Sequence, residues 1–575
     1  MDASLRELTI ARAHKGYRDG TFTARQVVEY YLQRIKTIDQ ADNGPKLNSI
    51  LAISSIAIAE ADALDTHLKS TSELKGPLHG IPVVVKDQAS TKGLATTYGS
   101  ILAKDYVPEQ DATLITRLKA AGAIILAKTT MPEILEDFAT SWHSTSSLSG
   151  TTKNPYDTKR DPGGSSSGTG AAVAADLGLL GVGEDTGGSI RVPSSFCGLV
   201  GIRVTPGIIS RAGFSPLLVP QDTPGPMCRT VTDAALMLDI LAGFDEQDPY
   251  TAAAVIAGPP TGGSYAANLS ADKIKSARIG VLRDVFGPES SPDSQAVNKV
   301  ITGALQTLQD NGTVLVDVEI PNLMKLLEIT FTYHQRSRSD LDDFFSRHPF
   351  LKTNTKEIYD SKKYHPALDL FEGIATGIGT PQEDPDFTAR LLAREELQRA
   401  ITVTLAKHNL DALAFPDVQI PAPLLEDVLS QRWPAADFPT NTLVSSQSLF
   451  PSVTVPAGLT QGGSGLPVGL ELVSLPYREQ KLLELAYGVE QLVQGRKPPV
   501  LFPTLCGEKV VSVTEQKREI CNSNFLVTDI CMTLILIVLE GPMGKSSDQK
   551  EEGVAACLLL RNQDTGLKLL RSLGV

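Results

Sequence analysis

The sequence predicts an α/β protein in which helices cover the faces of a β-sheet. Short apolar runs rich in β-branched residues alternate with segments whose apolar residues recur at helical spacing, and this alternation is typical of the class. The chain has 575 residues, of which 42% are hydrophobic, so it can bury a substantial core.

The first predicted elements are helices, within residues 22–65. Thr23 is a suitable N-cap for residues 25–38 (RQVVEYYLQRIKTI), in which apolar side chains fall on one helical face. Residues 54–65 (SSIAIAEADALD) repeat the spacing. The whole stretch is therefore predicted as helical.

Two strands follow. Residues 80–88 (GIPVVVKDQ) form a β-branched run that predicts a buried strand ending at Lys86. The helix-like segment 112–122 (ATLITRLKAAG) leads into a second strand-like run at 123–129 (AIILAKT). This order of elements is what an α/β sheet requires.

The second half of the chain resumes the pattern after a Gly/Pro/Ser-rich break at 258–270. Residues 327–377 are richer in aromatic and charged residues and are interpreted as a lid or substrate-facing insertion. The remaining predicted strands are 278–286, 411–417 and 468–475, and the remaining predicted helices are 294–312 and 478–495.

The end of the chain has a different character. Residues 507–575 lack clear helix caps, and their apolar run 530–540 is too short to span a bilayer. We interpret 507–575 as an atypical tail, appended to the fold or poorly ordered, and residues 1–506 as one domain.

Charge and cysteine content restrict the partners. The net charge of −13 disfavours nucleic acid or stable insertion in an anionic membrane, because both require basic surface. The first residues lack the apolar core of a signal peptide, and the six cysteines form no CxxC pair. We expect a cytoplasmic protein with reduced thiols, no structural zinc and a small-molecule substrate.

Two glycine- and serine-rich runs need an explanation, residues 161–176 (DPGGSSSGTGAAVAAD) and residues 183–195 (GEDTGGSIRVPSS). Most serines in such runs are hydrogen-bonded turn residues. The first run lacks the Lys-Ser/Thr of a phosphate-binding loop, and its GTGAAV segment fails the dinucleotide fingerprint. Ser166 is the centre of a G-x-S-x-G elbow, but a polar approach containing prolines replaces the strand that such an elbow requires.

A nucleophilic serine needs a base, and none of the eight histidines lies in a recognisable motif. Lys86 is a candidate because burial at the end of an apolar strand lowers the pKa of a lysine. The alternative is that Lys86 reaches solvent or pairs with Asp87. When Lys86 is considered without the other motifs, this alternative is favoured.

Three motifs in order change this balance. Lys86 in GIPVVVKD, Ser165 in GGSSSG and Ser189 in DTGGSIRVP resemble the Ser-cisSer-Lys hydrolases of the amidase signature family, of the fungal and bacterial general amidase type. The resemblance covers residues 5–505. It includes the segments 92–100, 127–133, 153–157, 193–202 and 222–238.

The resemblance implies an amidase signature fold with a large, mixed, twisted β-sheet flanked by helices on both faces. Its catalytic core would occupy residues 75–245. The implied activity is cleavage of a carboxamide to a carboxylic acid and an amine or ammonia through an acyl-enzyme, without a metal or an organic cofactor. A homodimer is left open.

The resemblance also implies roles for residues. Ser189 would be the nucleophile, Ser165 would follow a cis peptide bond and relay the proton, and Lys86 would be the general base and acid. The backbone N–H groups of the oxyanion hole would come from Thr186, Gly187, Gly188 and Ser189.

Neighbouring residues have supporting or packing roles. Asp185 and Arg191 match the charged pair that flanks the nucleophile loop, and Ser166 is expected to be a hydrogen-bonding neighbour of the site. Cys197 in PSSFCG is expected to pack rather than react. The chain departs from the family pattern at Ser167, where glycine is usual, and at Glu184, where threonine is frequent.

Two other functions remain open. The same three residues serve in the glutamine-hydrolysing component of an amidotransferase, which delivers ammonia to a partner enzyme. A catalytically silent relative that only binds ligands is the second alternative, although Lys86, Ser165 and Ser189 are all present.

Overall fold

The computed structural model of the protein describes most of the chain. The described residues are 3–132, 143–348, 350, 353–365, 369–461, 465–500, 536–538 and 556–558. Backbone contacts divide the chain into two units, Met1–Glu508 and Lys509–Val575. Most of the predicted tail lies outside the described residues, but β14 (Leu536–Val538) pairs antiparallel with β15 (Ala556–Leu558). The domain boundaries drawn from the sequence stay predictions.

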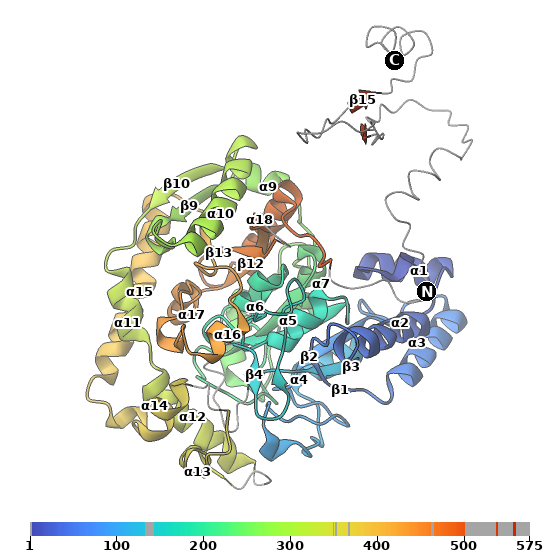
Figure 1. Cartoon of the computed structure of the whole chain (residues 1–575), viewed down its shortest axis with the longest axis horizontal. Helices are drawn as coiled ribbons and strands as arrows, with labels where there is room; N and C mark the ends of the chain where they lie inside the picture. Colours follow the sequence, from blue (N-terminus) through green and yellow to red (C-terminus); the bar gives the residue numbers. More distant parts are fainter. Residues whose placement is uncertain are drawn as a thin grey trace, which may run out of the picture. The chain divides into compact units, whose positions relative to one another are not determined.

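In the described part of the first unit, eleven strands form one mixed sheet, in the order β1-β3-β2-β6-β8-β7-β12-β13-β11-β9-β10 (Figure 1). The strands are β1 (Ile50–Ile53), β2 (Pro82–Lys86), β3 (Ile124–Thr129), β6 (Leu180–Asp185), β7 (Val200–Arg203), β8 (Thr223–Cys228), β9 (Arg278–Leu282), β10 (Val314–Val318), β11 (Ala412–Pro416), β12 (Ser452–Leu459) and β13 (Pro467–Val473). A separate hairpin joins β4 (Thr145–Ser146) to β5 (Gly150–Thr151).

Helices flank the sheet. They are α1 (Ile10–Asp19), α2 (Ala24–Arg34), α3 (Ala57–Thr71), α4 (Thr113–Ala120), α5 (Ser167–Ala174), α6 (Arg191–Phe196), α7 (Val231–Leu241), α8 (Ala252–Ala257), α9 (Asp272–Lys275), α10 (Pro292–Asp310), α11 (Leu323–Thr330), α12 (Tyr333–Arg347), α13 (Thr355–Ser361), α14 (Asp369–Thr376), α15 (Phe387–Lys407), α16 (Leu425–Leu429), α17 (Leu443–Ser448) and α18 (Glu479–Val493). Every residue of β2, β3, β6 and β8 is buried, so both faces of the central sheet are covered, as the sequence predicts.

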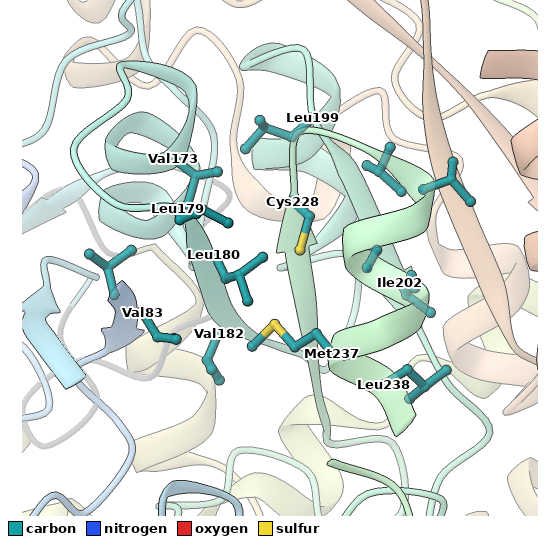
Figure 2. Close-up of a cluster of buried hydrophobic side chains, with 14 of the residues drawn as sticks. Val83, Val173, Leu179, Leu180, Val182, Leu199, Ile202, Cys228, Met237 and Leu238 are labelled. Carbon is teal, nitrogen blue, oxygen red and sulfur yellow. The ribbon is translucent and has the colours of Figure 1, made fainter. Parts of the chain in front are cut away.

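The centre of the core lies around β6 and β8 (Figure 2). Leu180 and Val182 from β6 and Val83 from β2 are fully buried, and Met237 of α7 closes the same cluster. The thiol of Cys228 lies among these side chains and behaves as a small apolar group.

The predicted N-cap is confirmed, but one part of the helical prediction is wrong. The Thr23 hydroxyl accepts from the Gln26 N–H, and the Gln26 side chain accepts from the Thr23 N–H, which makes a capping box. Residues 50–53, predicted within a helical stretch, form the edge strand β1 paired antiparallel with β3. A four-residue edge strand is too short for its period to show in the sequence.

The predicted strands at 80–88, 123–129, 411–417 and 468–475 are present. The strand expected at 278–286 stops at Leu282, where a 3₁₀ turn begins. Two of the missed strands, β6 (LGVGED) and β8 (TPGPMC), are poor in β-branched residues. A Cβ on Gly183 of β6 would lie 2.6 Å from Met227 Sδ of β8, so neighbouring side chains occupy the space beside this glycine and tertiary packing replaces strand propensity here.

Residues 327–377 contribute to a small core of their own. The helices α12, α13 and α14 lie together (Figure 1) and pack around Phe344, Ile358 and Phe371. Leu217 and Leu218, from the loop before β8, join the same cluster. This contact brings the predicted insertion onto the loops that follow the central strands.

Candidate active site

The site lies at the carboxyl ends of two neighbouring strands. β2 and β6 are parallel and adjacent, with Val85 opposite Val182, so Lys86 and Asp185 end their strands at the same edge of the sheet. Clefts of open α/β sheets form at this edge. The serine-rich run enters α5 beside the two strand ends.

Lys86 is fully buried and its ammonium group faces a serine. Lys86 Nζ lies 2.7 Å from Ser165 Oγ and 3.4 Å from both the backbone oxygen and Oε2 of Glu184. The alternative that Lys86 reaches solvent or pairs with Asp87 is wrong. Asp87 instead lies 3.6 Å from Lys128 Nζ and accepts from the Thr97 N–H at 2.9 Å.

Burial sets the protonation of this pair. It lowers the pKa of Lys86 below the ordinary value, and nearby carboxylates, Glu184 foremost, oppose the shift. Burial also raises the pKa of Glu184 to about 7, although the charge of Lys86 acts in the opposite direction. Both charged forms are therefore disfavoured in the same small volume.

The serine run is held against the loop that carries Ser189 by its backbone. The Gly164–Ser165 peptide bond is cis, as the resemblance implies. The Ser166 N–H donates to the Ser189 carbonyl at 3.1 Å, while Ser166 Oγ lies 3.2 Å from both N and O of Glu184. Ser166 therefore joins the run to β6.

Asp185 shapes the loop that carries Ser189. Its carboxylate accepts from the Gly188 and Ile190 N–H groups, both at 3.0 Å, and pairs with Arg191 and Arg203, both at 2.9 Å. Burial alone would raise the pKa of Asp185, but the two arginines hold it well below the ordinary value.

Arg191 connects this loop to the second half of the chain. It is fully buried, and its Nη1 donates to Glu471 Oε1 at 2.6 Å and to the Thr442 carbonyl at 2.8 Å. Ser445 Oγ accepts from the same nitrogen at 2.5 Å. Residues more than 250 positions apart therefore fix one loop.

The two glycines before Ser189 are required by close packing. A Cβ on Gly187 would overlap the hydroxyl of Tyr333, and a Cβ on Gly188 would overlap the side chain of Thr442. Gly188 also has φ 137°, which favours glycine. The sequence analysis expected the Gly188 N–H to be free to bind the oxyanion. In the structure this N–H donates to the Asp185 carboxylate instead.

Cys197 and Ser167, two residues singled out in the sequence, are both buried. Cys197 is buried, its thiol lies 3.6 Å from the Pro162 carbonyl, and burial raises the pKa of that thiol well above the ordinary value. These features fit packing rather than reactivity. Ser167 Oγ is buried without a hydrogen-bond partner among the described residues, so this departure from glycine adds no polar contact there.

Sequence reasoning missed several residues that build the site. Arg203, Tyr333 and Thr442 reach the Asp185–Ser189 loop from other elements. Glu471 pairs with Arg191 just after that loop, and no local motif marks any of the four residues. Glu184 was noticed only as a departure from a pattern. Its place next to Asp185 at the end of a strand was the available signal.

A cavity of about 380 Å³ adjoins this edge of the sheet. Glu184 and Asp222 line it together with Phe214 from the loop 210–218 and Phe344 from α12. The insertion at 327–377, interpreted from the sequence as a lid or substrate-facing segment, therefore reaches this cavity through Phe344.

The described residues contain neither a candidate metal centre nor a candidate membrane span. No group of three or more His, Cys, Asp or Glu side chains among them is placed to hold a metal ion. The described helices include none with the length and hydropathy of a membrane span.

Comparison with known proteins decides the family. A sequence model described as Amidase matches residues 26–483, most of the chain. The chain belongs to the amidase family. It is therefore a hydrolase of amide C–N bonds, which confirms the expectation from the three motifs.

Relatives of this amidase cover nearly its whole first unit. The solved structure of native peptide amidase from Stenotrophomonas maltophilia is 32% identical with a TM-score of 0.74, and covers 87% of this chain and 99% of that one. A glutamyl-tRNA(Gln) amidotransferase subunit from Bdellovibrio bacteriovorus is 30% identical over 528 residues, 87% of this chain and 99% of that protein.

Substitution at Gly187 tests the packing of the loop before Ser189. We expect Gly187→Ala to lower amidase activity by about 10²-fold or more, because the new Cβ overlaps the Tyr333 hydroxyl and displaces the loop. The next atom of Tyr333 would lie 3.5 Å away, an ordinary contact. Adding Tyr333→Phe should therefore restore most of the lost activity, and steady-state kinetics of the double-mutant cycle measure it. Independent, additive losses would contradict the packing argument.

Removal of Arg191 tests the buried ion network. We expect Arg191→Met to lower the free energy of unfolding by about 3–5 kcal/mol, because Glu471 stays buried without its cationic partner and Asp185 keeps only Arg203. Urea denaturation measures the change. Arg347→Met breaks an exposed pair with Asp343 and should change stability by less than about 1 kcal/mol. Equal effects of the two variants would show that burial of the network is unimportant.

Proposed function

We propose that this amidase acts by a serine acyl-enzyme mechanism with Ser189 as nucleophile, Ser165 as proton relay and Lys86 as general base and acid. The observation that carries the proposal is the contact between a fully buried Lys86 Nζ and Ser165 Oγ at 2.7 Å. Such burial favours the neutral amine that a base requires.

The proton moves along the three residues in sequence. Neutral Lys86 accepts the proton of Ser165, and Ser165 accepts that of Ser189 as Ser189 Oγ forms a bond to the amide carbonyl carbon. When the C–N bond breaks, the same path returns the proton to the leaving amine. Water then repeats the attack on the acyl-enzyme and releases the acid.

The oxyanion is stabilised by backbone N–H groups of the nucleophile loop. Thr186, Gly187 and Ser189 retain N–H groups that take part in no backbone or side-chain hydrogen bond among the described residues. The Gly188 N–H holds the loop through Asp185 instead. One such donor is worth about 2.7–4 kcal/mol in the transition state.

The cavity next to Glu184 is proposed to receive the substrate. Phe214 and Phe344 supply apolar surface, while Arg211 and His348 supply polar surface. The insertion at 327–377 therefore has a substrate-facing part in α12. A small carboxamide with an apolar group fits this lining.

A stand-alone hydrolase is favoured over a component of an amidotransferase. The relatives named as glutamyl-tRNA(Gln) amidotransferase make the alternative real, since they match at about the same identity as peptide amidase. The cavity here, however, is lined by α12 of the same chain, and Tyr333 of α12 contacts the loop before Ser189. A homodimer and a cytoplasmic location stay predictions.

Removal of the proposed catalytic groups should abolish turnover. Against a panel of aryl and alkyl amides and aminoacyl amides, Ser189→Ala should lose at least about 10³-fold in kcat/KM. Lys86→Ala should lose at least about 10²-fold, because the proton then has no acceptor. Ser167→Ala is the matched control, since its hydroxyl has no described partner, and should stay within about threefold of the parent. Near-parental activity of Ser189→Ala would refute the mechanism.

The amidotransferase alternative has its own test. The chain purified alone should hydrolyse simple amides at a rate that does not depend on added protein, because the cavity needs no second chain. Size-exclusion chromatography and kinetics on the pure protein check this. Glutamine hydrolysis that appears only with a stoichiometric co-purified partner would reverse the assignment.

A further inference from the structure

Glu184 is the residue next to the proposed base that the mechanism above leaves unused. It is 2% exposed and is the penultimate residue of β6. Its Oε2 lies 3.4 Å from Lys86 Nζ, and its Oε1 lies 3.1 Å from Thr186 Oγ1. Ser166 Oγ contacts both N and O of the Glu184 backbone. Backbone and side chain are thus both held, with the carboxyl group facing the lysine.

This position creates a conflict with the role of Lys86. A base must be neutral to accept a proton, yet an anionic carboxylate within about 4–6 Å stabilises the protonated form of a lysine by about 1–3 pKa units. Burial favours the neutral forms of both groups, so their protonation states depend on each other.

Other charged groups around Glu184 do not remove the conflict. Asp222 accepts from Thr186 Oγ1 at 2.6 Å and adds negative charge from the residue before β8. The charge of Asp185 is matched by Arg191 and Arg203. The other charged and titratable groups that act on Glu184 or Lys86, or line the same cavity, are Tyr333, Arg211, Asp248, Tyr250, Arg347 and His348.

Among the described residues, Lys86 is nevertheless the cation that forms an ion pair with Glu184. Arg211 is engaged by Asp248 at 2.7 Å, and Arg347 is engaged by Asp343 at 2.7 Å. Lys86 and Glu184 therefore influence each other's protonation more directly than the other charged groups around the cavity do.

We propose that Glu184 is a positioning residue that forms a proton-sharing pair with Lys86, so that its carboxylate sets the lower pH limit of this amidase. The inference rests on the proposed function of Lys86. The carboxylate delays the loss of the lysine proton as pH rises, and it stabilises the lysinium that forms when Ser189 attacks. Glu184 gains no net proton over a cycle, because the proton taken from Ser189 returns to the leaving amine.

Removing the Glu184 carboxylate should shift the pH dependence of the activity. Without the carboxylate, Lys86 has less reason to stay protonated, so its free amine is present at lower pH. The acidic limb of the activity profile then moves to lower pH. The high-pH plateau falls, because the lysinium formed in the reaction loses its counter-charge.

The experiment uses the rate at which an alkyl fluorophosphonate inactivates the full chain, because this probe reports activation of Ser189 without a known substrate. Rates are measured from about pH 5 to about pH 10 for the parent, Glu184→Gln and Glu184→Thr. Glutamine keeps the shape of the side chain, and threonine is the residue frequent in the family at this position. Glu319→Gln is the control, because it makes the same charge change at an exposed site.

We expect the acidic limb to move down by at least about one pH unit in both Glu184 variants and to stay in place in Glu319→Gln. A limb that is unchanged or moves up in folded variants, or inactivation that is lost at every pH, would overturn the inference. Circular dichroism establishes folding, and Glu184→Thr decides the matter if Glu184→Gln does not fold.

The same experiment separates this inference from the proposed function. Ser189→Ala should not be labelled at any pH. Labelling of Ser189→Ala at the parental rate would refute the mechanism and the inference together. A labelled parent, an unlabelled Ser189→Ala and an unshifted Glu184→Gln would refute the role of Glu184 alone.

Discussion

The buried carboxylate of Asp185 is the constraint on which the rest of the site depends. It accepts two backbone N–H groups and pairs with two arginines, all without exposure to solvent. Breaking such a network leaves uncompensated buried charge, so the loop between β6 and α6 has little freedom to move. Arg191 extends this restraint to Glu471 in β13. The place of Ser189 is therefore fixed by strands that lie far apart in the sequence.

The sequence predicted the fold where propensity and burial agree. β2 and β3 are β-branched, and both were found with nearly their observed bounds. β6 and β8 contain glycine and proline and were missed, because their strand conformation depends on neighbours that a local pattern does not contain. Met227 and Thr169 fill the space beside Gly183 and Gly181. Tertiary packing overrides weak strand propensity in the centre of this sheet.

The residues of the candidate site also differ in whether a local sequence pattern could predict them. Lys86, Ser165 and Ser189 were found from the order and spacing of three motifs, and the structure brings Lys86 and Ser165 into contact. The contacts of Glu184 and Tyr333 could not be predicted, because they require knowing that β2 lies beside β6 and that α12 packs on the nucleophile loop. Local sequence identifies reactive groups, and the arrangement of the sheet determines which groups control them.

A second buried lysine shows how the contacts of Lys86, the proposed base, differ from those of a structural cation. Lys128 Nζ donates to Thr96 Oγ1 at 2.9 Å and to the carbonyl oxygens of Asp87 and Ala89, and burial lowers its pKa to about 8. These acceptors require the protons of an ammonium and hold it in place. Lys86 Nζ also lies 3.4 Å from two acceptor oxygens of Glu184, but its nearest partner is the hydroxyl of Ser165, which can accept or donate, so the neutral amine also keeps a partner. Burial alone does not make a lysine a base. A partner that accommodates both protonation states is also needed.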